Sequence, residues 1–141
     1  MKEYWVNVYH YGAMPDSLFQ QLLKDISGWK TSLIEIIPVN YGELLTRPDY
    51  LSLLEQISVA LPQTQIVLPT NGSLLNQGNI KELCGIKTLK IINFSINAYF
   101  DETYTQFTGL SADILHKMRE NIIIFHSLRP DIMTVTSMVF D

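Results

Sequence analysis

The sequence is poor in cysteine, since Cys84 is the only one among 141 residues. A single thiol excludes a disulfide framework within the chain and any metal site built from its own cysteines. Cys84 falls on the apolar face of a short expected helix, where a cysteine usually behaves as a small hydrophobic residue. We therefore expect a structural role for it.

Long apolar runs and basic clusters are also missing. No run reaches the ~18–20 apolar residues of a membrane-spanning helix, and the first residues lack the apolar core and cleavage site of a signal peptide. The ten Lys and Arg residues form no stripe and the net charge is −4, which argues against nucleic acid as the main partner. We expect a cytoplasmic protein that binds neither membrane nor nucleic acid.

The common catalytic signatures are absent too. The chain has no Ser/His/Asp arrangement, no spaced His/Asp metal set, no phosphate-binding P-loop and no glycine-rich dinucleotide fingerprint. Its three histidines are scattered at His10, His116 and His126. The sequence therefore gives no sign of a hydrolytic site.

What is present is an alternation of strand and helix patterns. With 47% hydrophobic and 17% charged residues, the chain can bury a real core, and its length suits a single domain over residues 1–141. The expected strands are 3–9, 33–39, 65–68, 88–96 and 132–140. The expected helices are 16–28, 48–61, 77–84, 101–107 and one that begins at Ser111 and is broken at 129–131. In this last helix, Ile114, Met118, Ile122 and Phe125 are expected on one apolar face.

The middle strands are continuous apolar runs, which is typical of parallel strands covered on both faces or closed in a barrel. Right-handed crossovers place the carboxyl ends of such strands on one rim. A complete eightfold barrel needs ~200 residues or more. We therefore predict an α/β fold with a parallel sheet of about five strands and crossover helices, either open or part of a barrel.

Polar residues recur where three successive strands end. The groups are Asn40, Tyr41, Gly42 and Glu43, then Thr70, Asn71 and Gly72, then Ser95 and Asn97, and a fourth group is expected at Asp141 after the last strand. Ligands bind at such strand ends in α/β folds, and these groups supply close backbone approach, hydroxyls, amides and one carboxylate. They predict a site for a polar small molecule.

Each group also has a purely structural interpretation. Thr70–Asn71–Gly72 suits a tight turn, because Asn-Gly accommodates positive φ. Glu43 can be a solvated or capping carboxylate, and Ser95 and Asn97 can cap the helix that follows.

Three segments, in order and each at a strand end, resemble motifs of the radical S-adenosylmethionine (SAM) superfamily. Residues 42–49, GELLTRPD, are similar to Gly-Glu-Pro-Leu-Leu-x-Pro-Asp; residues 70–75, TNGSLL, to Thr-Asn-Gly-x-Leu-Leu; and residues 93–109 to Ser-Ile-Asp followed by Thr-Tyr and a glycine. The resemblance runs from about Leu18 to Asp141. It implies a radical SAM-like domain that forms part of a (βα)6 partial TIM-type barrel.

The resemblance implies that S-adenosylmethionine lies across the strand ends. Gly42 and Glu43 then meet its methionine amino group, Thr70 and Asn71 line the pocket, and Ser95 contacts its methionine or ribose part, with Asn97 standing where the family has Asp. These six residues are the expected cofactor-binding site, and no catalytic residue is identified.

Two departures limit the resemblance. Leu44 replaces a proline, and the Cys-x-x-x-Cys-x-x-Cys loop that holds a [4Fe–4S] cluster is missing. One cysteine cannot hold such a cluster, so this chain should not cleave S-adenosylmethionine reductively. Either the chain is a fragment whose cysteine loop lies upstream and whose last βα unit is absent, or it is a degenerate relative in which residues 10–15 are a shortened loop.

The expected function is therefore that of a radical SAM-like protein which, complete, would start radical chemistry on an unidentified substrate, and of which this chain carries the S-adenosylmethionine site. The alternative is a non-catalytic ligand-binding or scaffold domain derived from that fold. The apolar last strand, 132–140, also predicts self-association, because exposed strand edges pair readily.

Overall fold

A computed structural model describes residues 14–39 and 42–138. The chain divides at Lys30 into two compact units, which are described separately. The expected first strand, 3–9, lies outside the described residues. The described part of the first unit is helix α2 (Asp16–Ser27), which follows Pro15 and ends at Gly28, as the sequence predicts.

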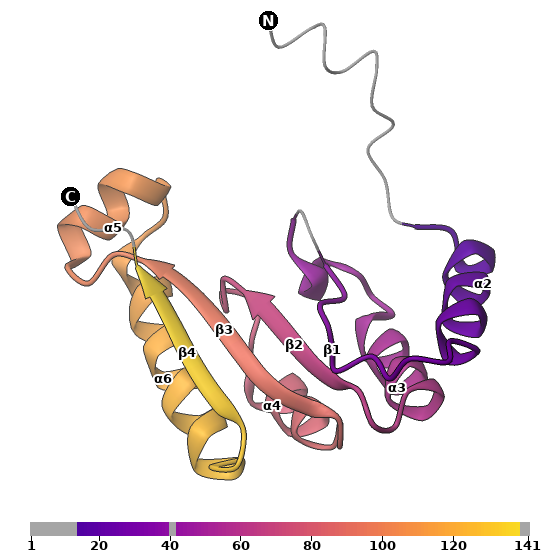
Figure 1. Ribbon diagram of the computed structural model, residues 1–141. Helices are drawn as coiled ribbons and strands as arrows, with labels where there is room; N and C mark the ends of the chain where they lie inside the picture. Colours follow the sequence, from indigo (N-terminus) through magenta and orange to yellow (C-terminus); the bar gives the residue numbers. More distant parts are fainter. Residues whose placement is uncertain (1–13, 40–41, 139–141) are drawn as a thin grey trace, which may run out of the picture. The chain divides into compact units, whose positions relative to one another are not determined.

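The second unit, from Thr31 onward, alternates strands and helices (Figure 1). In chain order its elements are β1 (Glu35–Ile36), the 3-10 helix η1 (Leu44–Thr46), α3 (Tyr50–Ala60), β2 (Gln65–Thr70), α4 (Gln77–Cys84), β3 (Leu89–Asn97), α5 (Asp101–Thr108), α6 (Ala112–Leu128) and β4 (Met133–Met138).

The strands form one parallel sheet in the order β1-β2-β3-β4. Its register places Thr70 of β2 opposite Phe94 of β3, and Phe94 opposite Thr136 of β4. The α/β class and the parallel sheet are therefore confirmed. The expectation of about five strands is not met, because the described residues contain four, and four strands in a row do not form a barrel.

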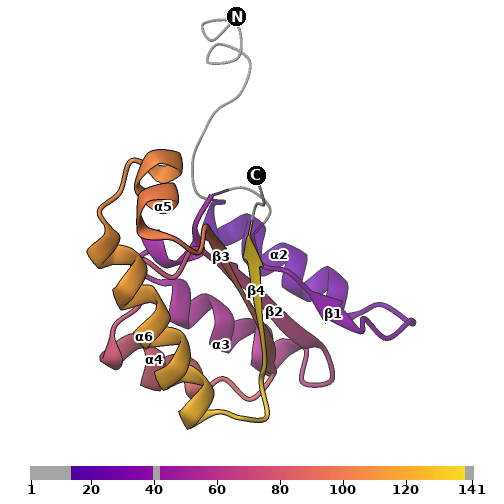
Figure 2. The ribbon, with the colours of Figure 1, turned by 90° about the vertical axis from the view of Figure 1, so that its left-hand side faces the viewer.

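Helices α3, α4 and α6 lie on one side of the sheet (Figure 2). This follows from the strand order, because right-handed crossovers between strands that are neighbours in both sequence and space all pass over the same face. The core fills the space between. Phe94 of β3 meets Phe125 of α6 edge to face, with ring centroids 6.5 Å apart, and both side chains are fully buried.

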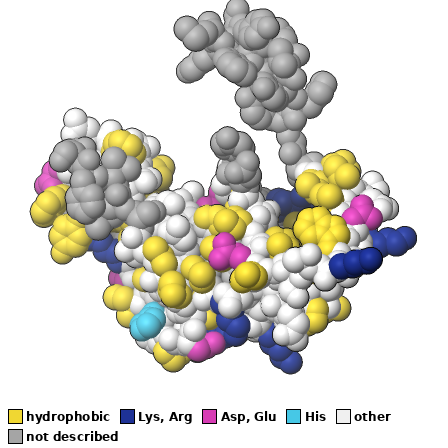
Figure 3. Space-filling model, viewed as in Figure 1, with side chains coloured by type: hydrophobic (Ala, Val, Ile, Leu, Met, Phe, Trp, Pro, Cys, Tyr) yellow, Lys and Arg dark blue, Asp and Glu magenta, His cyan; other side chains and the backbone are white. Residues whose placement is uncertain are grey.

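The opposite face of the sheet carries the alternate residues of each strand. On β3 these are Ile91, Asn93, Ser95 and Asn97, all half-buried, whereas the intervening residues are buried against the helices. Figure 3 views this face, and hydrophobic side chains gather on it. Within the described part of the second unit, no helix covers it.

One sequence prediction needs correction in detail. The expected strand 33–39 pairs with β2 only at Glu35 and Ile36, partly because Pro38 has no backbone N–H to donate.

None of the described helices is long and apolar enough to cross a membrane.

Candidate functional site

The carboxyl ends of β1, β2 and β3 meet at one edge of the sheet, because neighbouring strands run parallel. The three polar groups singled out in the sequence follow these ends. Gly42 and Glu43 come between β1 and η1, Thr70 and Asn71 close β2, and Ser95 and Asn97 lie at the end of β3. The other expected members, Asn40, Tyr41 and Asp141, lie outside the described residues. We call this edge of the sheet the rim.

Glu43 joins two parts of the rim. Its Oε2 accepts hydrogen bonds from the Thr70 hydroxyl at 3.0 Å and from the Asn71 backbone N–H at 2.8 Å. Its Oε1 accepts from the Leu45 backbone N–H at 3.1 Å, which caps η1. The carboxylate therefore fixes the loop after β1 to the end of β2.

Counting the described residues alone, one acceptor position of Glu43 remains. A carboxylate has about four lone-pair sites, and the three bonds occupy both sites of Oε2 and one of Oε1. The side chain is half-buried. Oε1 can accordingly accept one further hydrogen bond from a cationic or neutral donor without breaking the three that order the loop.

Thr70 and Asn71 are tied into the loop that follows β2. The Thr70 hydroxyl, besides donating to Glu43, accepts from the Gly72 N–H at 3.0 Å. The Asn71 Oδ1 accepts from the Ser73 N–H at 2.9 Å and from the Ser73 hydroxyl at 2.6 Å. Both side chains therefore stabilise the turn, as the structural interpretation of Thr-Asn-Gly expected.

Glycine is required at position 72 for two reasons. Its φ is +73°, and a Cβ placed there would lie 3.1 Å from Cδ1 of Phe94. Gly42 also has a positive φ, +92°, with open space around it. L-residues adopt this backbone region at a cost of about 1–2 kcal/mol, so both turns of the rim depend on glycine.

Ser95 and Asn97 sit on the neighbouring strand. Because Thr70 pairs with Phe94, Ser95 lies one residue further along, on the sheet face opposite the helices. Asn97 has a φ of +68°, the only positive value outside glycine among the described residues. The pairing with β4 shifts between Ser95 and Asn97. Such bulges turn a strand end and change the direction of its side chains.

The site residues therefore form two groups. Glu43, Thr70 and Asn71 are brought together by direct hydrogen bonds. Within the described residues, the side chains of Ser95 and Asn97 do not join this network.

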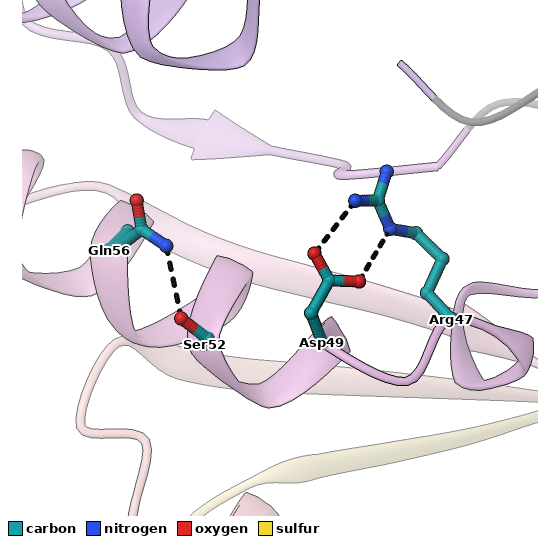
Figure 4. Close-up of polar contacts among 4 residues, drawn as sticks. All are labelled: Arg47, Asp49, Ser52 and Gln56. Carbon is teal, nitrogen blue, oxygen red and sulfur yellow. Dashed lines mark hydrogen bonds and ion pairs between the residues drawn. The ribbon is translucent and has the colours of Figure 1, made fainter. Parts of the chain in front are cut away.

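An ion pair follows η1 (Figure 4). Arg47 donates from Nε and from a terminal nitrogen to the two carboxylate oxygens of Asp49, at 3.0 and 2.8 Å. This hydrogen bonding lowers the pKa of Asp49. Asp49 stands at the N-cap of α3, yet its side chain makes no capping bond there. Within α3, Gln56 donates to the hydroxyl of Ser52, one turn earlier in the helix, at 3.1 Å.

One supporting residue was missed in the sequence. Asn121 of α6 is buried, and its Nδ2 donates to the backbone carbonyl of Leu75 at 2.9 Å. Leu75 lies at the end of the loop that begins at Thr70. The hydrogen bond from Asn121 therefore connects α6 to this loop. No local sequence signal indicates this role, because the partner is 46 positions away.

Cys84 lies at the opposite edge of the sheet from the rim. It is the last residue of α4, before β3 begins, and its carbonyl accepts a hydrogen bond from Arg129, which precedes β4. It therefore lies at the edge where strands start. Burial raises the pKa of its thiol, which disfavours the thiolate that binds iron. Among the described residues, no group of three or more His, Cys, Asp or Glu side chains is placed to hold a metal ion.

No protein-family model matches the chain, and no curated protein matches it. The radical SAM resemblance therefore remains a prediction.

Proposed function

We propose that the rim binds S-adenosylmethionine, and that the chain is a radical SAM-like domain that carries the S-adenosylmethionine site without the cluster. The observation that carries the proposal is the Glu43 carboxylate, which is ordered by three internal hydrogen bonds and retains one acceptor position on Oε1. An ammonium group is the natural donor for such a position.

The strand order supports the same proposal. Four parallel strands in sequential order, with the helices on one face, have the arrangement of a sector of a (βα) barrel. A doubly wound sheet differs, since its strand order reverses at a switch point and its helices cover both faces. We propose that this sheet is part of a (βα)6 partial barrel and that its uncovered face corresponds to the barrel interior.

Each residue of the rim has its own role in this proposal. Glu43 accepts from the ligand's amino group, while Thr70 and Asn71 position Glu43. The positive φ of Gly42 and Gly72 lets backbone groups approach the ligand. Ser95 and Asn97 contribute a hydroxyl and an amide from β3. S-adenosylmethionine would supply the adenosyl group that radical enzymes use.

The [4Fe–4S] cluster does not fit this chain. Clusters of this kind are held by several thiolates, whereas the chain has only Cys84, which lies at the opposite edge of the sheet from Glu43. We therefore assign no radical step to these residues. A second candidate follows from the same observation: a non-catalytic domain that binds S-adenosylmethionine or a related nucleoside.

Isothermal titration with S-adenosylmethionine tests the proposal. We expect binding to the wild type, and a dissociation constant raised at least about tenfold by Glu43→Gln, since hydrogen bonds to charged groups contribute about 1.5–3 kcal/mol. Ser95→Ala should weaken binding less. Glu55→Gln, an exposed change on α3, is the matched control and should bind like the wild type.

Thr70→Val separates contact from positioning. It removes a hydrogen bond of Glu43 but keeps the carboxylate, so its effect on binding should be smaller than that of Glu43→Gln. Absence of binding at millimolar ligand would reject the proposal and leave the scaffold alternative. Equal effects of the two variants would show that loop order, and not the carboxylate, is what binding requires.

A further inference from the structure

The outer edge of β4 has no partner among the described residues, since β4 ends the strand order β1-β2-β3-β4. The strand, Met133–Met138, contains neither proline nor a charged residue. Natural edge strands usually carry such residues, because a row of unpaired N–H and C=O groups is a template for another strand. This edge is therefore chemically ready to pair.

The three residues Thr134–Val135–Thr136 of β4 are symmetric about Val135. Thr134 and Thr136 flank it on either side. When two copies of a strand pair antiparallel about a twofold axis at Val135, each Val135 lies opposite its copy and each Thr134 lies opposite Thr136 of the other chain. Cross-strand pairs of β-branched residues and of threonines are favourable, and no like charges meet.

Two apolar side chains of β4 are exposed on one face of the sheet. Met133 is 60% exposed and Val135 is 37% exposed, and both lie on the sheet face opposite the helices. We propose that a second copy of this chain pairs with β4 antiparallel, with the twofold axis at Val135. The two sheets then become one continuous sheet. This inference is independent of what the rim binds.

Light scattering on the 141-residue chain over a concentration series measures the association. We expect a mass near twice 16.2 kDa. Val135→Lys should shift the dimer dissociation constant upward by about tenfold or more, because two like charges then face each other. Val59→Lys is the matched control, since Val59 is 82% exposed on α3, and it should leave the dimer intact.

Disulfide trapping tests the register. In a Cys84→Ser background, Val135→Cys should cross-link on oxidation, because opposite Cα atoms lie about 4.5–5.5 Å apart, within disulfide range. Thr136→Cys should not, because its own copy is then about 8 Å away along the diagonal. If Val135→Lys fails to fold, this pair of variants still decides the question.

Four outcomes would overturn the proposal. One is a monomer at every concentration, and another is a dimer that Val135→Lys leaves intact. The third is cross-linking at Thr136→Cys but not at Val135→Cys. Larger aggregates without a discrete dimer would also reject it, since a twofold pairing closes on itself.

Discussion

The hydroxyl of Thr70 donates a hydrogen bond to the carboxylate of Glu43 across 27 positions of sequence, at 3.0 Å. Thr70 is 3% exposed, so water does not readily replace this bond. The contact connects the loop after β1 with the end of β2. With the bond that the Asn71 N–H donates to the same oxygen, it makes the shape of the rim depend on the Glu43 carboxylate.

A double-mutant cycle should reveal this coupling. Glu43→Gln and Thr70→Val should each lower the free energy of unfolding by about 1–3 kcal/mol, because each weakens the hydrogen bonding between the buried Thr70 and the half-buried Glu43. The double variant should lose less than the sum, since both changes break the same bond. Urea unfolding measures the losses. Glu55→Gln combined with Thr70→Val is the control pair and should be additive, and additivity in both pairs would contradict the coupling.

Gly72→Ala should destabilise the protein more than Gly109→Ala. Both glycines have a φ of +73°, but only the Cβ at position 72 would meet Phe94, whereas that at 109 has open space. The backbone cost of about 1–2 kcal/mol is shared, and overpacking adds about 1–3 kcal/mol at Gly72. Thermal or urea unfolding of the two variants checks this. Equal losses would mean that Phe94 moves aside freely.

Asp131 should make the free energy of unfolding depend on pH in the acidic range. Hydrogen bonds from Arg129, at 2.7 and 2.8 Å, lower the pKa of Asp131 from 3.8 to about 2. A pKa lowered in the folded state stabilises the fold above the unfolded value, and this stabilisation disappears as the pH falls from about 3.8 to about 2. Stability in that window should fall more steeply for the wild type than for Asp131→Asn. Parallel curves would show that the pair contributes nothing.

Anaerobic reconstitution with iron and sulfide should give no stable cluster. The chain has one cysteine, and cluster irons need several thiolates. Cys84→Ser should behave like the wild type in iron analysis and in absorbance. About four irons per chain, with a thiolate–iron absorbance band that Cys84→Ser abolishes, would contradict this expectation.

Much of the element order follows from the sequence. The bounds of α4 are as predicted, because Asn76 caps its start and Gly85 follows its end, and both are local signals. The face of α6 was predicted less well. Ile114 and Ile122 were expected in the buried stripe with Met118 and Phe125, but Leu115 and Asn121 are buried in their place.

The reason is that periodicity marks a broad sector of a helix, whereas the neighbouring elements decide which residues at its margin are buried. Asn121 is polar, so no hydrophobic pattern includes it, and its burial depends on the carbonyl of Leu75. The rim has the same limit. Glu43, Thr70 and Asn71 were placed at one edge from strand ends alone, but the bonds among them require the folded sheet.

The sequential strand order also has a consequence for how the protein is made. Each strand pairs with the one translated just before it, so a nascent chain leaving the ribosome can add one βα unit at a time without waiting for a distant partner. Contacts of short sequence separation favour rapid folding, and domains fold during synthesis from the N-terminal side. The most recently synthesised strand therefore always lies at the edge of the growing sheet. The last strand to be synthesised is also the last to pair.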